Sequence, residues 1–369
     1  MRITARGSDL RRAFSIVSDA VPNKPALPIL ANVLIVADSE GLFITASSLD
    51  ITIRTKVDAT INEMGCLTVP AKITREIISE WPDEDIDITS DEESMILTSD
   101  SGQYTLQGMP SDDFPEMPDK MDGTVIPIGG SGIDPVVMAD MINKTSFAVS
   151  QDDTRPVLQG VFCRTNEEGV SMVATDGHRL SCYTYPIMGL SDAEAIIPPQ
   201  CLSSLAKMCN GDGELIINGT NISCAIGDTV LVSRLIEGPY VDYQQVIPQP
   251  GENILTVDRD VLQPTLKRVS ILSSQHTRQI NLSLGEKVEM SAISAERGGD
   301  AREEVSADYD GKEMTVGYNG QYLQEILKFI SGVITINFTN ETTASIIQSS
   351  NQEVGDLFYL LMPLRPNAG

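Results

Sequence analysis

Residues 8–21 read SDLRRAFSIVSDAV, and segments of the same kind return as DPVVMADMINKTSFAV from Asp134 and DRDVLQPTLKRVSIL from Asp258. Each segment opens with residues suited to capping a helix. Apolar residues of the first segment recur at i, i+4, i+7 and i+11, which places them on one helical face. Asp9, Asp134 and Asp258 lie 125 and 124 residues apart. The spacing predicts one amphipathic helix in each of three repeats.

Two further segments recur in the same order. A turn leads into a β-type run in LPILANVLIV from Leu27, RPVLQGVFC from Arg155 and RQINLSL from Arg278. A β run meets a second helix in LTVPAKITREIISEW from Leu67, AIIPPQCLSSLAKM from Ala195 and MTVGYNGQYLQEILKFI from Met314. Any α+β protein alternates helices and strands, but three copies in one order at nearly constant spacing favour a true repeat.

Segments rich in Pro, Gly and Asp separate the repeats, as linkers between domains do. They read MPSDDFPEMPDKMDGTV and VIPQPGEN. We therefore predict an α+β fold with three similar domains, at residues 1–123, 124–251 and 252–369.

Composition indicates a globular chain and gives no sign of bound cofactors or metals. The 369 residues are 41% hydrophobic and 21% charged, without a run near the roughly 18 apolar residues that span a bilayer. The start lacks an apolar signal-peptide region, so a soluble, cytoplasmic protein is expected. The six cysteines lack CxxC spacing, which predicts reduced and mostly buried thiols. His178 and His276, the two histidines, have no metal-ligand spacing, and phosphate-loop, dinucleotide and nucleophile-elbow motifs are absent.

Charge is unevenly distributed along the chain. The net charge is -26, yet the six predicted helical segments hold 12 basic and 9 acidic residues while the remainder holds 14 and 43. The segments are residues 8–24, 70–82, 134–150, 198–210, 258–278 and 318–330. Helices gathered on one surface would tolerate a polyanion there, with weak, salt-sensitive and sequence-independent binding. Helix surfaces also favour Lys and Arg for propensity reasons alone, so charge does not decide between these interpretations.

The sequence TDGH, residues 175–178, has two interpretations. Asp176 and Gly177 lie between two β-type runs, where Asp-Gly predicts a hairpin turn. Asp176 and His178 could instead serve as an acid-base pair in an α+β enzyme that processes carbohydrates or phosphates. For the protein as a whole, a plain scaffold that never binds a polyanion such as DNA is a third possibility.

Several motifs together resemble one protein family. They are ATDGHRL at 174–180, RPVLQG at 155–160, LLMPLR at 360–365, KPALPIL at 24–30 and DYQQVIP at 242–248. In this combination the chain resembles the sliding-clamp family, the β subunits of bacterial DNA polymerase III. The resemblance runs from Met1 to about Arg365.

The resemblance implies three similar DNA-clamp domains per chain and a head-to-tail homodimer that forms a six-domain ring, with helices inside and sheets outside. Such a ring encircles double-stranded DNA without reading its sequence. The protein would be a non-catalytic processivity factor of a DNA-directed DNA polymerase, a nucleotidyltransferase, in the cytoplasm. Expected partners are a second copy, polymerases, the clamp loader and repair proteins that carry short linear motifs, with no membrane and no cofactor.

The family also has a hydrophobic cleft for those linear motifs, between the second and third domains. The matching positions here are Leu158, Thr175, Gly177, His178, Arg179, Leu180, Val241, Val246, Leu360, Met362, Pro363 and Leu364. Aliphatic and Met side chains suit an adaptable pocket. The apolar members could equally be ordinary core, and LLMPL could be only a closing strand.

Two more sets of residues follow from the resemblance. Positions expected to contact DNA, with added helix-face candidates, are Lys24, Lys72, Gln151, Asn319, Tyr322, Arg11, Arg12, Lys207, Lys267 and Arg268. The dimer seam is expected at Tyr104, Leu106, Ile271, Leu272, Asp300, Glu303 and Glu304. Basic residues that relatives place at the seam are mostly replaced here by Ser94, Ser101 and Gln103, so we expect apolar contact and strand pairing to hold it rather than ion pairs.

Overall fold

The computed structural model describes residues 1–91, 93–117, 121–351 and 354–364. It divides into two compact units, which are treated separately here. The first unit comprises Met1–Asp140 and Leu190–Ile236, and the second comprises Met141–Gly189 and Glu237–Gly369. Arg365, the last residue of the LLMPLR motif, lies outside the described residues.

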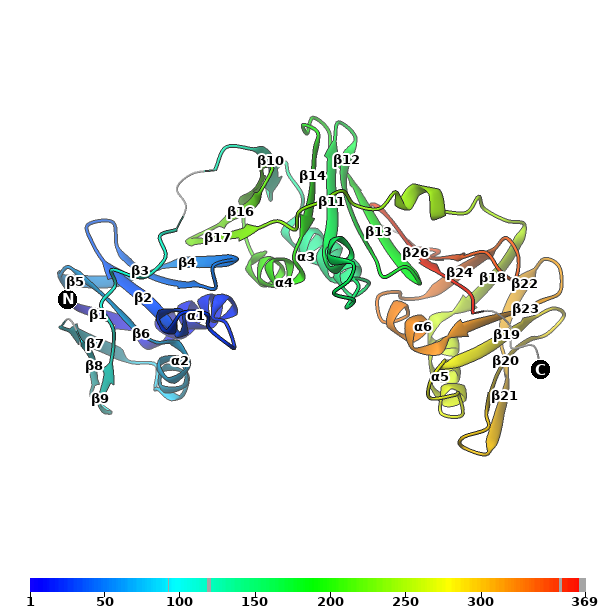
Figure 1. Ribbon diagram of the computed structural model, residues 1–369, viewed down its shortest axis with the longest axis horizontal. Helices are drawn as coiled ribbons and strands as arrows, with labels where there is room; N and C mark the ends of the chain where they lie inside the picture. Colours follow the sequence, from blue (N-terminus) through cyan, green and yellow to red (C-terminus); the bar gives the residue numbers. More distant parts are fainter. Residues whose placement is uncertain (92, 118–120, 352–353, 365–369) are drawn as a thin grey trace. The chain divides into compact units, whose positions relative to one another are not determined.

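One order of elements occurs three times along the chain (Figure 1). The first copy has β1 (Arg2–Arg6), α1 (Gly7–Val17), β2 (Asn32–Ala37), β3 (Leu42–Ser47), β4 (Ile51–Val57), β5 (Ala59–Glu63), β6 (Gly65–Pro70), α2 (Ala71–Glu80), β7 (Asp85–Ser90), β8 (Ser94–Ser99) and β9 (Gly102–Gln107). The second has β10 (Thr124–Ile128), α3 (Pro135–Ser146), β11 (Val161–Asn166), β12 (Gly169–Thr175), β13 (Arg179–Pro186), β14 (Ala193–Ile197), α4 (Pro199–Met208), β15 (Gly213–Ile217), β16 (Asn221–Ile226) and β17 (Thr229–Arg234).

The third copy has β18 (Asn253–Asp258), α5 (Arg259–Ser270), β19 (Gln279–Leu284), β20 (Val288–Ser294), β21 (Gly299–Val305), β22 (Ala307–Asp310), β23 (Met314–Asn319), α6 (Gly320–Ile326), β24 (Val333–Phe338), β25 (Ser345–Ser349) and β26 (Asp356–Leu361). The predicted threefold repeat of an α+β unit is therefore confirmed. The second copy has four strands between its helices where the other two copies have five.

Two of the three predicted helix caps are present. Asp258 accepts a hydrogen bond from the backbone N–H of Asp260 at 2.7 Å, and Asp134 accepts one from Val136 at 2.8 Å. The prediction for Ser8 and Asp9 was wrong, because β1 runs directly into α1, which begins at Gly7. Asp83 caps this helix instead, accepting from the Ser8 N–H at 3.0 Å. Hydrogen bonds from the Ser8 hydroxyl and from this N–H hold the pKa of the Asp83 carboxyl below its usual value.

Other element boundaries also differ from the sequence predictions. The segments after Leu27 and Arg155 begin with short 3-10 turns, η2 (Pro28–Ala31) and η3 (Pro156–Gln159), before their strands start. The helices predicted at 8–24, 134–150, 258–278 and 318–330 all end earlier, at Val17, Ser146, Ser270 and Ile326. The hydroxyl of Ser146 donates to a carbonyl one turn back, which competes with continuation of the helix.

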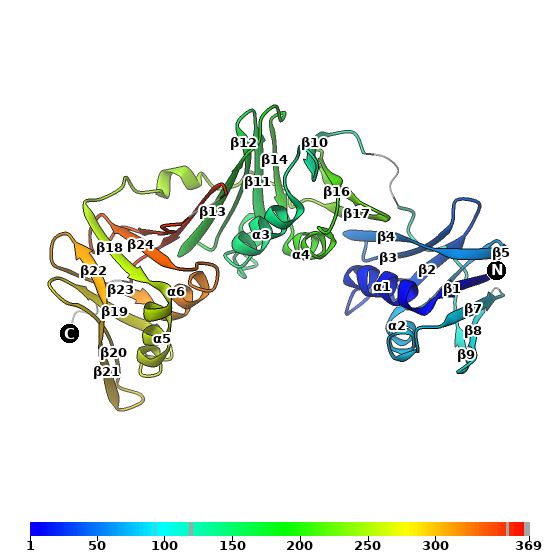
Figure 2. The ribbon, with the colours of Figure 1, turned by 180° about the vertical axis from the view of Figure 1, so that it is seen from behind.

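In the first unit, one continuous sheet joins the first repeat to the second. Its strand order is β10-β15-β16-β17-β4-β3-β2-β6, and a second sheet has the order β5-β1-β7-β8-β9. The joint is the antiparallel pairing of β17 with β4, in which Leu231 lies opposite Ile53. Helices α1 and α2 contact each other, and α1 packs on β3 and β4 (Figures 1 and 2).

In the second unit, the second and third repeats are joined in the same way. Strands run in the order β11-β12-β13-β26-β25-β24-β18-β22, and a four-stranded sheet has the order β21-β20-β19-β23. Antiparallel pairing of β13 with β26 places Leu180 opposite Leu360. Helices α5 and α6 contact each other, and α5 packs on β20 and β21 over a core that includes Leu262, Leu266 and Phe338.

Both joints therefore obey one rule. The last strand of a repeat, β17 or β26, pairs with the third strand after the first helix of the preceding repeat, β4 or β13. Even single hydrogen bonds correspond, since Arg234 N donates to Asp50 O and Met362 N donates to His178 O, each at 2.8 Å. The same rule leaves the last strand of the first repeat, β9, and the third strand of the third repeat, β21, at the ends of their sheets.

Candidate functional site

The predicted hairpin at Asp176–Gly177 is confirmed, and its backbone is firmly held. The Asp176 carboxylate accepts the N–H groups of His178 at 2.8 Å and Arg179 at 3.0 Å. The Thr175 hydroxyl donates to the Arg179 carbonyl at 2.6 Å and accepts from the Gly177 N–H at 3.1 Å. Gly177 has a φ of 90°, a conformation that other residues adopt only with strain. The turn joins β12 to β13.

The turn lies against the end of the chain. Leu180 and Leu360 are paired residues of β13 and β26 and are both buried, and Leu158 of η3 is buried as well. Just beyond β26, Met362 is 41% exposed while its N–H is bound to the His178 carbonyl. The structure thus brings the hairpin members and the C-terminal members of the predicted cleft together, with a buried aliphatic floor and an exposed methionine.

The remaining cleft candidates come from two other segments of the chain. Val241 and Val246 are exposed at 42% and 55%; Val241 precedes the 3-10 turn η4 (Tyr243–Val246), and Val246 is its last residue. The preceding Tyr240 ring stacks on Phe162 of β11, with centroids 4.9 Å apart. At the C-terminal end, the Leu364 N–H donates to the Gly317 carbonyl at 2.8 Å, and Pro363 is half-buried.

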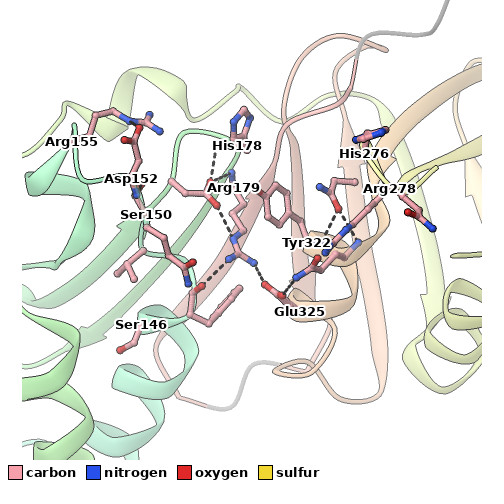
Figure 3. Close-up of a pocket in the computed structure, with 17 residues that line it drawn as sticks. Ser146, Ser150, Asp152, Arg155, His178, Arg179, His276, Arg278, Tyr322 and Glu325 are labelled. Atoms are coloured by element: carbon pink, nitrogen blue, oxygen red, sulfur yellow. Dashed lines mark hydrogen bonds and ion pairs between the residues drawn. The ribbon is translucent and has the colours of Figure 1, made fainter. Parts of the chain in front are cut away.

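Arg179 is buried like Leu180 and Leu360, with 8% of its side chain exposed, but unlike them it makes charged contacts (Figure 3). Its Nε atom donates to Asp176 at 3.1 Å, a terminal nitrogen donates to the Phe147 carbonyl at 2.9 Å, and the other forms an ion pair with Glu325 of α6. The guanidinium also lies over the Tyr322 ring, 4.6 Å from its centroid.

Arg179 helps to line a polar pocket of about 810 Å³. Its lining residues are Ser146, Phe147, Val149, Ser150, Gln151, Asp152, Arg155, Asp176, His178, Arg179, Gln275, His276, Arg278, Asn319, Gln321, Tyr322 and Glu325. Three of the predicted DNA contacts, Gln151, Asn319 and Tyr322, therefore share one pocket with His178 and Arg179, which were predicted for the peptide cleft. The sequence had given no reason to connect these two groups.

Glu325 and Phe147 were not among the predicted site residues. Glu325 is three positions beyond Tyr322 on α6, so helical spacing could have placed it on the same face. Burial acts to raise its pKa, but hydrogen bonds from Gln321 and Arg179 outweigh that effect and lower the pKa below the ordinary value of 4.5. Burial, followed by the Asp176 charge, raises the pKa of the Tyr322 phenol.

The alternative role of Asp176 as an enzymatic acid or base is not supported. One of its oxygens accepts two backbone N–H groups and the other accepts from Arg179, so the carboxylate is committed to the turn. The His178 ring stacks on Tyr322, with centroids 6.3 Å apart. Among the described residues, no cluster of three or more His, Cys, Asp or Glu side chains could hold a metal ion.

The basic candidates of the first unit occupy different environments. Arg11 donates to the carbonyls of Ile78 and Trp81, at 3.4 and 2.6 Å, and so holds the end of α2. Arg12 and Lys207 line a pocket of about 440 Å³, where Lys207 is paired with Asp19 at 2.7 Å. Two further candidates are exposed, and these are Lys24 and Lys72.

The candidates in the third repeat are divided between free and paired side chains. Lys267 is exposed on α5, whereas Arg268 is bound to Glu303 at 2.7 Å. Glu304 is bound to Lys287 at 2.8 Å. Two of the three acids expected at the dimer seam therefore have basic partners in their own chain, and Asp300 is the third, on β21.

Apolar side chains are exposed at the expected seam positions. On β9, Tyr104 is 49% exposed and packs on Trp81, with ring centroids 4.9 Å apart, and Leu106 is partly exposed. Beyond α5, Ile271 is exposed, and its neighbour Leu272 is partly exposed. Both edge strands thus carry accessible apolar groups beside them.

The described helices include none that is long and apolar enough to cross a membrane. Five of the six cysteines are at least partly buried, and Cys66 is exposed. Burial raises the pKa of the Cys163 and Cys201 thiols to about 12. The expectation of mostly buried thiols is confirmed, and these groups are poor nucleophiles at neutral pH.

Comparisons with known proteins cover nearly the whole chain. The models of the DNA polymerase III beta subunit match in order, with its N-terminal domain at residues 1–118, its central domain at 132–242 and its C-terminal domain at 244–365. Beta sliding clamps of Synechococcus elongatus and a Synechocystis strain are 30% identical over 385 residues and 31% identical over 402 residues, covering 99% of each chain.

Solved structures agree with the sequence matches. A sliding clamp of Pseudomonas aeruginosa superimposes with a TM-score of 0.92 at 27% identity, covering 99% of both chains. A sliding clamp of Bacillus subtilis gives 0.89 at 26% identity, also over 99% of both. The repeated fold and these likenesses define a three-domain α+β clamp protein without catalytic machinery of its own. The chain belongs to the DNA polymerase III beta subunit family, the beta sliding clamps, which are the non-catalytic processivity factors of that polymerase.

Proposed function

We propose that two copies of this chain close head to tail into a ring around duplex DNA and tether partner proteins to it in the cytoplasm. One observation carries the ring: both internal joints pair the last strand of one repeat with the third strand of the repeat before it. Extended once more, that rule pairs β9 of one copy with β21 of another. Because each chain has one β9 edge and one β21 edge, a closed ring of copies leaves neither edge unpaired, and the likeness to sliding clamps favours two copies.

Other features support this pairing. β9 and β21 are edge strands, whose unpaired backbone groups are a template for another strand. Tyr104, Leu106 and Ile271 supply accessible apolar surface near them. Each chain would have three domains, with boundaries near residues 123 and 251. A ring of two chains would therefore contain six domains.

Contact with DNA is assigned to the helices and the polar pocket. Lys24, Lys72, Arg12 and Lys267 carry exposed cationic groups, and Gln151, Asn319 and Tyr322 share the pocket of the second unit. Because these exposed basic side chains are few and the net charge is -26, we expect weak contact with DNA that depends on its phosphates rather than its bases. Closure around the duplex, rather than affinity, would retain the protein on its template.

Retention on DNA of different topology tests the ring. Protein loaded onto a nicked circular plasmid should remain bound through gel filtration in moderate salt, and linearising the plasmid with a restriction enzyme should release it. Equal loss from circular and linear DNA would contradict encirclement. A mass of two chains in solution is expected in the same buffer.

Partner tethering is assigned to the surface formed by the hairpin, η4 and the C-terminal residues. Its occupants would be short linear motifs of polymerases, the clamp loader and repair proteins. Replacing both Met362 and Leu364 with Ala should abolish binding of a QLxLF-like peptide, because an exposed anchor and its neighbour are removed. The dimer mass should stay the same. Unchanged peptide affinity would refute this site.

A further inference from the structure

Arg179 joins two parts of the second unit that are distant in sequence. Its backbone closes the 175–179 turn, and its side chain reaches the Phe147 carbonyl after α3 and the Glu325 carboxylate on α6. Glu325 is itself oriented by Gln321, whose side-chain amide donates to it at 2.8 Å. In Figure 3 the guanidinium lies between the turn that carries His178 and the helix that carries Glu325.

The 175–179 turn also holds the C-terminal segment that contains Met362. Its His178 carbonyl accepts the Met362 N–H at 2.8 Å, so the position of this methionine depends on the position of the turn. Because 8% of the Arg179 side chain is exposed and each of its three nitrogens already donates to a protein oxygen, this side chain presents little surface to a bound peptide. The ion pair with Glu325 is partly buried, so losing one partner would leave the other charge without compensation.

We propose that Arg179 is a positioning residue for partner binding, and that Glu325, across the joint from the second to the third repeat, sets peptide affinity through it without touching the peptide. This inference rests on the proposed peptide site. It gives Glu325, which lines the polar pocket, a role in peptide binding. It also makes Arg179 a residue that supports the cleft rather than one that contacts the peptide.

A double-mutant cycle on the full-length protein tests the proposal. The variants are Glu325→Gln, Arg179→Met and the double variant, and the measurement is the Kd of a fluorescent QLxLF-like peptide by anisotropy. Glu325→Gln should weaken binding about fivefold, and Arg179→Met about tenfold or more. The double variant should bind no more weakly than Arg179→Met, because both changes break one connection. Arg179→Lys, which keeps the charge but not the fork of donors, should fall between wild type and Arg179→Met.

Matched controls separate positioning from general stability. Arg6→Gln breaks exposed ion pairs with Asp83 and Asp85 in the first repeat and should leave the peptide Kd unchanged. Glu325→Gln is nearly isosteric and keeps a hydrogen-bonding group, so it carries the test if Arg179→Met does not fold. Wild-type affinity of Glu325→Gln, or strictly additive effects in the cycle, would overturn the proposal.

The proposed site and this inference can fail independently. If replacing both Met362 and Leu364 with Ala abolishes peptide binding while Glu325→Gln has no effect, the site stands and the positioning role of Arg179 is wrong. If the double replacement leaves binding intact, the peptide site itself is wrong and the inference falls with it.

Discussion

The register of the proposed seam can be worked out from the two internal joints. In those joints the first residue of the third strand, Ile51 or Arg179, lies opposite Ser233 or Leu361 near the end of the last strand. Thr52, Leu180 and Gly299 hold the same place in their repeats, because each pairs with the residue five positions before it across a hairpin. Extending the register of the β4–β17 joint to β21 and β9 therefore sets Glu303 opposite Ser101, as Lys56 lies opposite Asp228. Ser101 is exposed and uncharged, so a charge placed there reports directly on the electrostatics of the seam.

The expected magnitude follows from Coulomb's law. Side chains directly opposite each other on paired strands lie about 5 Å apart, and like charges there cost up to about 1 kcal/mol in solvent. Arg268 partly neutralises Glu303, so we expect about 0.5–1 kcal/mol at each seam for Ser101→Glu. A ring has two seams, and the dimer should therefore dissociate about 5–30 times more readily. Ser101→Lys should shift the dimer constant in the opposite direction by a similar or smaller amount.

Sedimentation velocity over a range of protein concentrations measures these shifts. At about 0.5 M salt the Debye length falls below the distance between the charges, so both variants should approach wild type. The wild-type dimer should weaken little with salt, because Glu303 and Glu304 are already paired within their own chain. Shifts of both variants in the same direction, or steep dissociation of the wild type with added salt, would refute the reasoning.

Two further predictions concern stability. Leu49, at the turn position that Gly177 occupies in the second repeat, has a φ of 77° and is 45% exposed, so Leu49→Gly should raise the free energy of unfolding by about 0.5–1 kcal/mol in urea titrations, and a loss would contradict strain at this turn. The lowered pKa of Glu325 means that its stabilising contribution is complete above its ordinary value of 4.5 and is lost as the pH falls through the lower folded value. The stability difference between wild type and Glu325→Gln should therefore be constant from pH 6 to 8 and shrink in acid, and a difference that grows in acid would reverse the sign.

Local chemistry explains why much of the fold could be predicted from the sequence. Asp258 and Asp134 cap their helices through neighbouring N–H groups, and Asp176 and Gly177 form their turn with residues beside them. Periodicity alone places the apolar faces of the helices. Where all partners lie within a few residues, one sequence carries enough information to identify the element.

Predictions failed where the partner is distant in sequence. The cap of α1 comes from Asp83, 75 residues after Ser8, and the ion pair of Arg179 comes from Glu325, 146 residues away. The 3-10 turn at Pro28–Ala31 was predicted as the start of a β run, since its apolar residues also fit a strand. No local pattern reveals such pairings, because they arise only when separate repeats fold against each other.

The three kinds of joint in the proposed ring would be alike in strand pairing but unlike in connection. At β4–β17 and β13–β26 the paired strands belong to one chain, so the cost in entropy of bringing them together is limited by the length of the linker. At β9–β21 no covalent link exists, and each seam must also offset the loss of translational freedom of a whole subunit. Equal pairing therefore gives an unequal result: the seam is the weakest joint, and its strength depends on protein concentration. A ring that must be placed around DNA without free ends would open there, while the internal joints keep the cleft and the polar pocket intact.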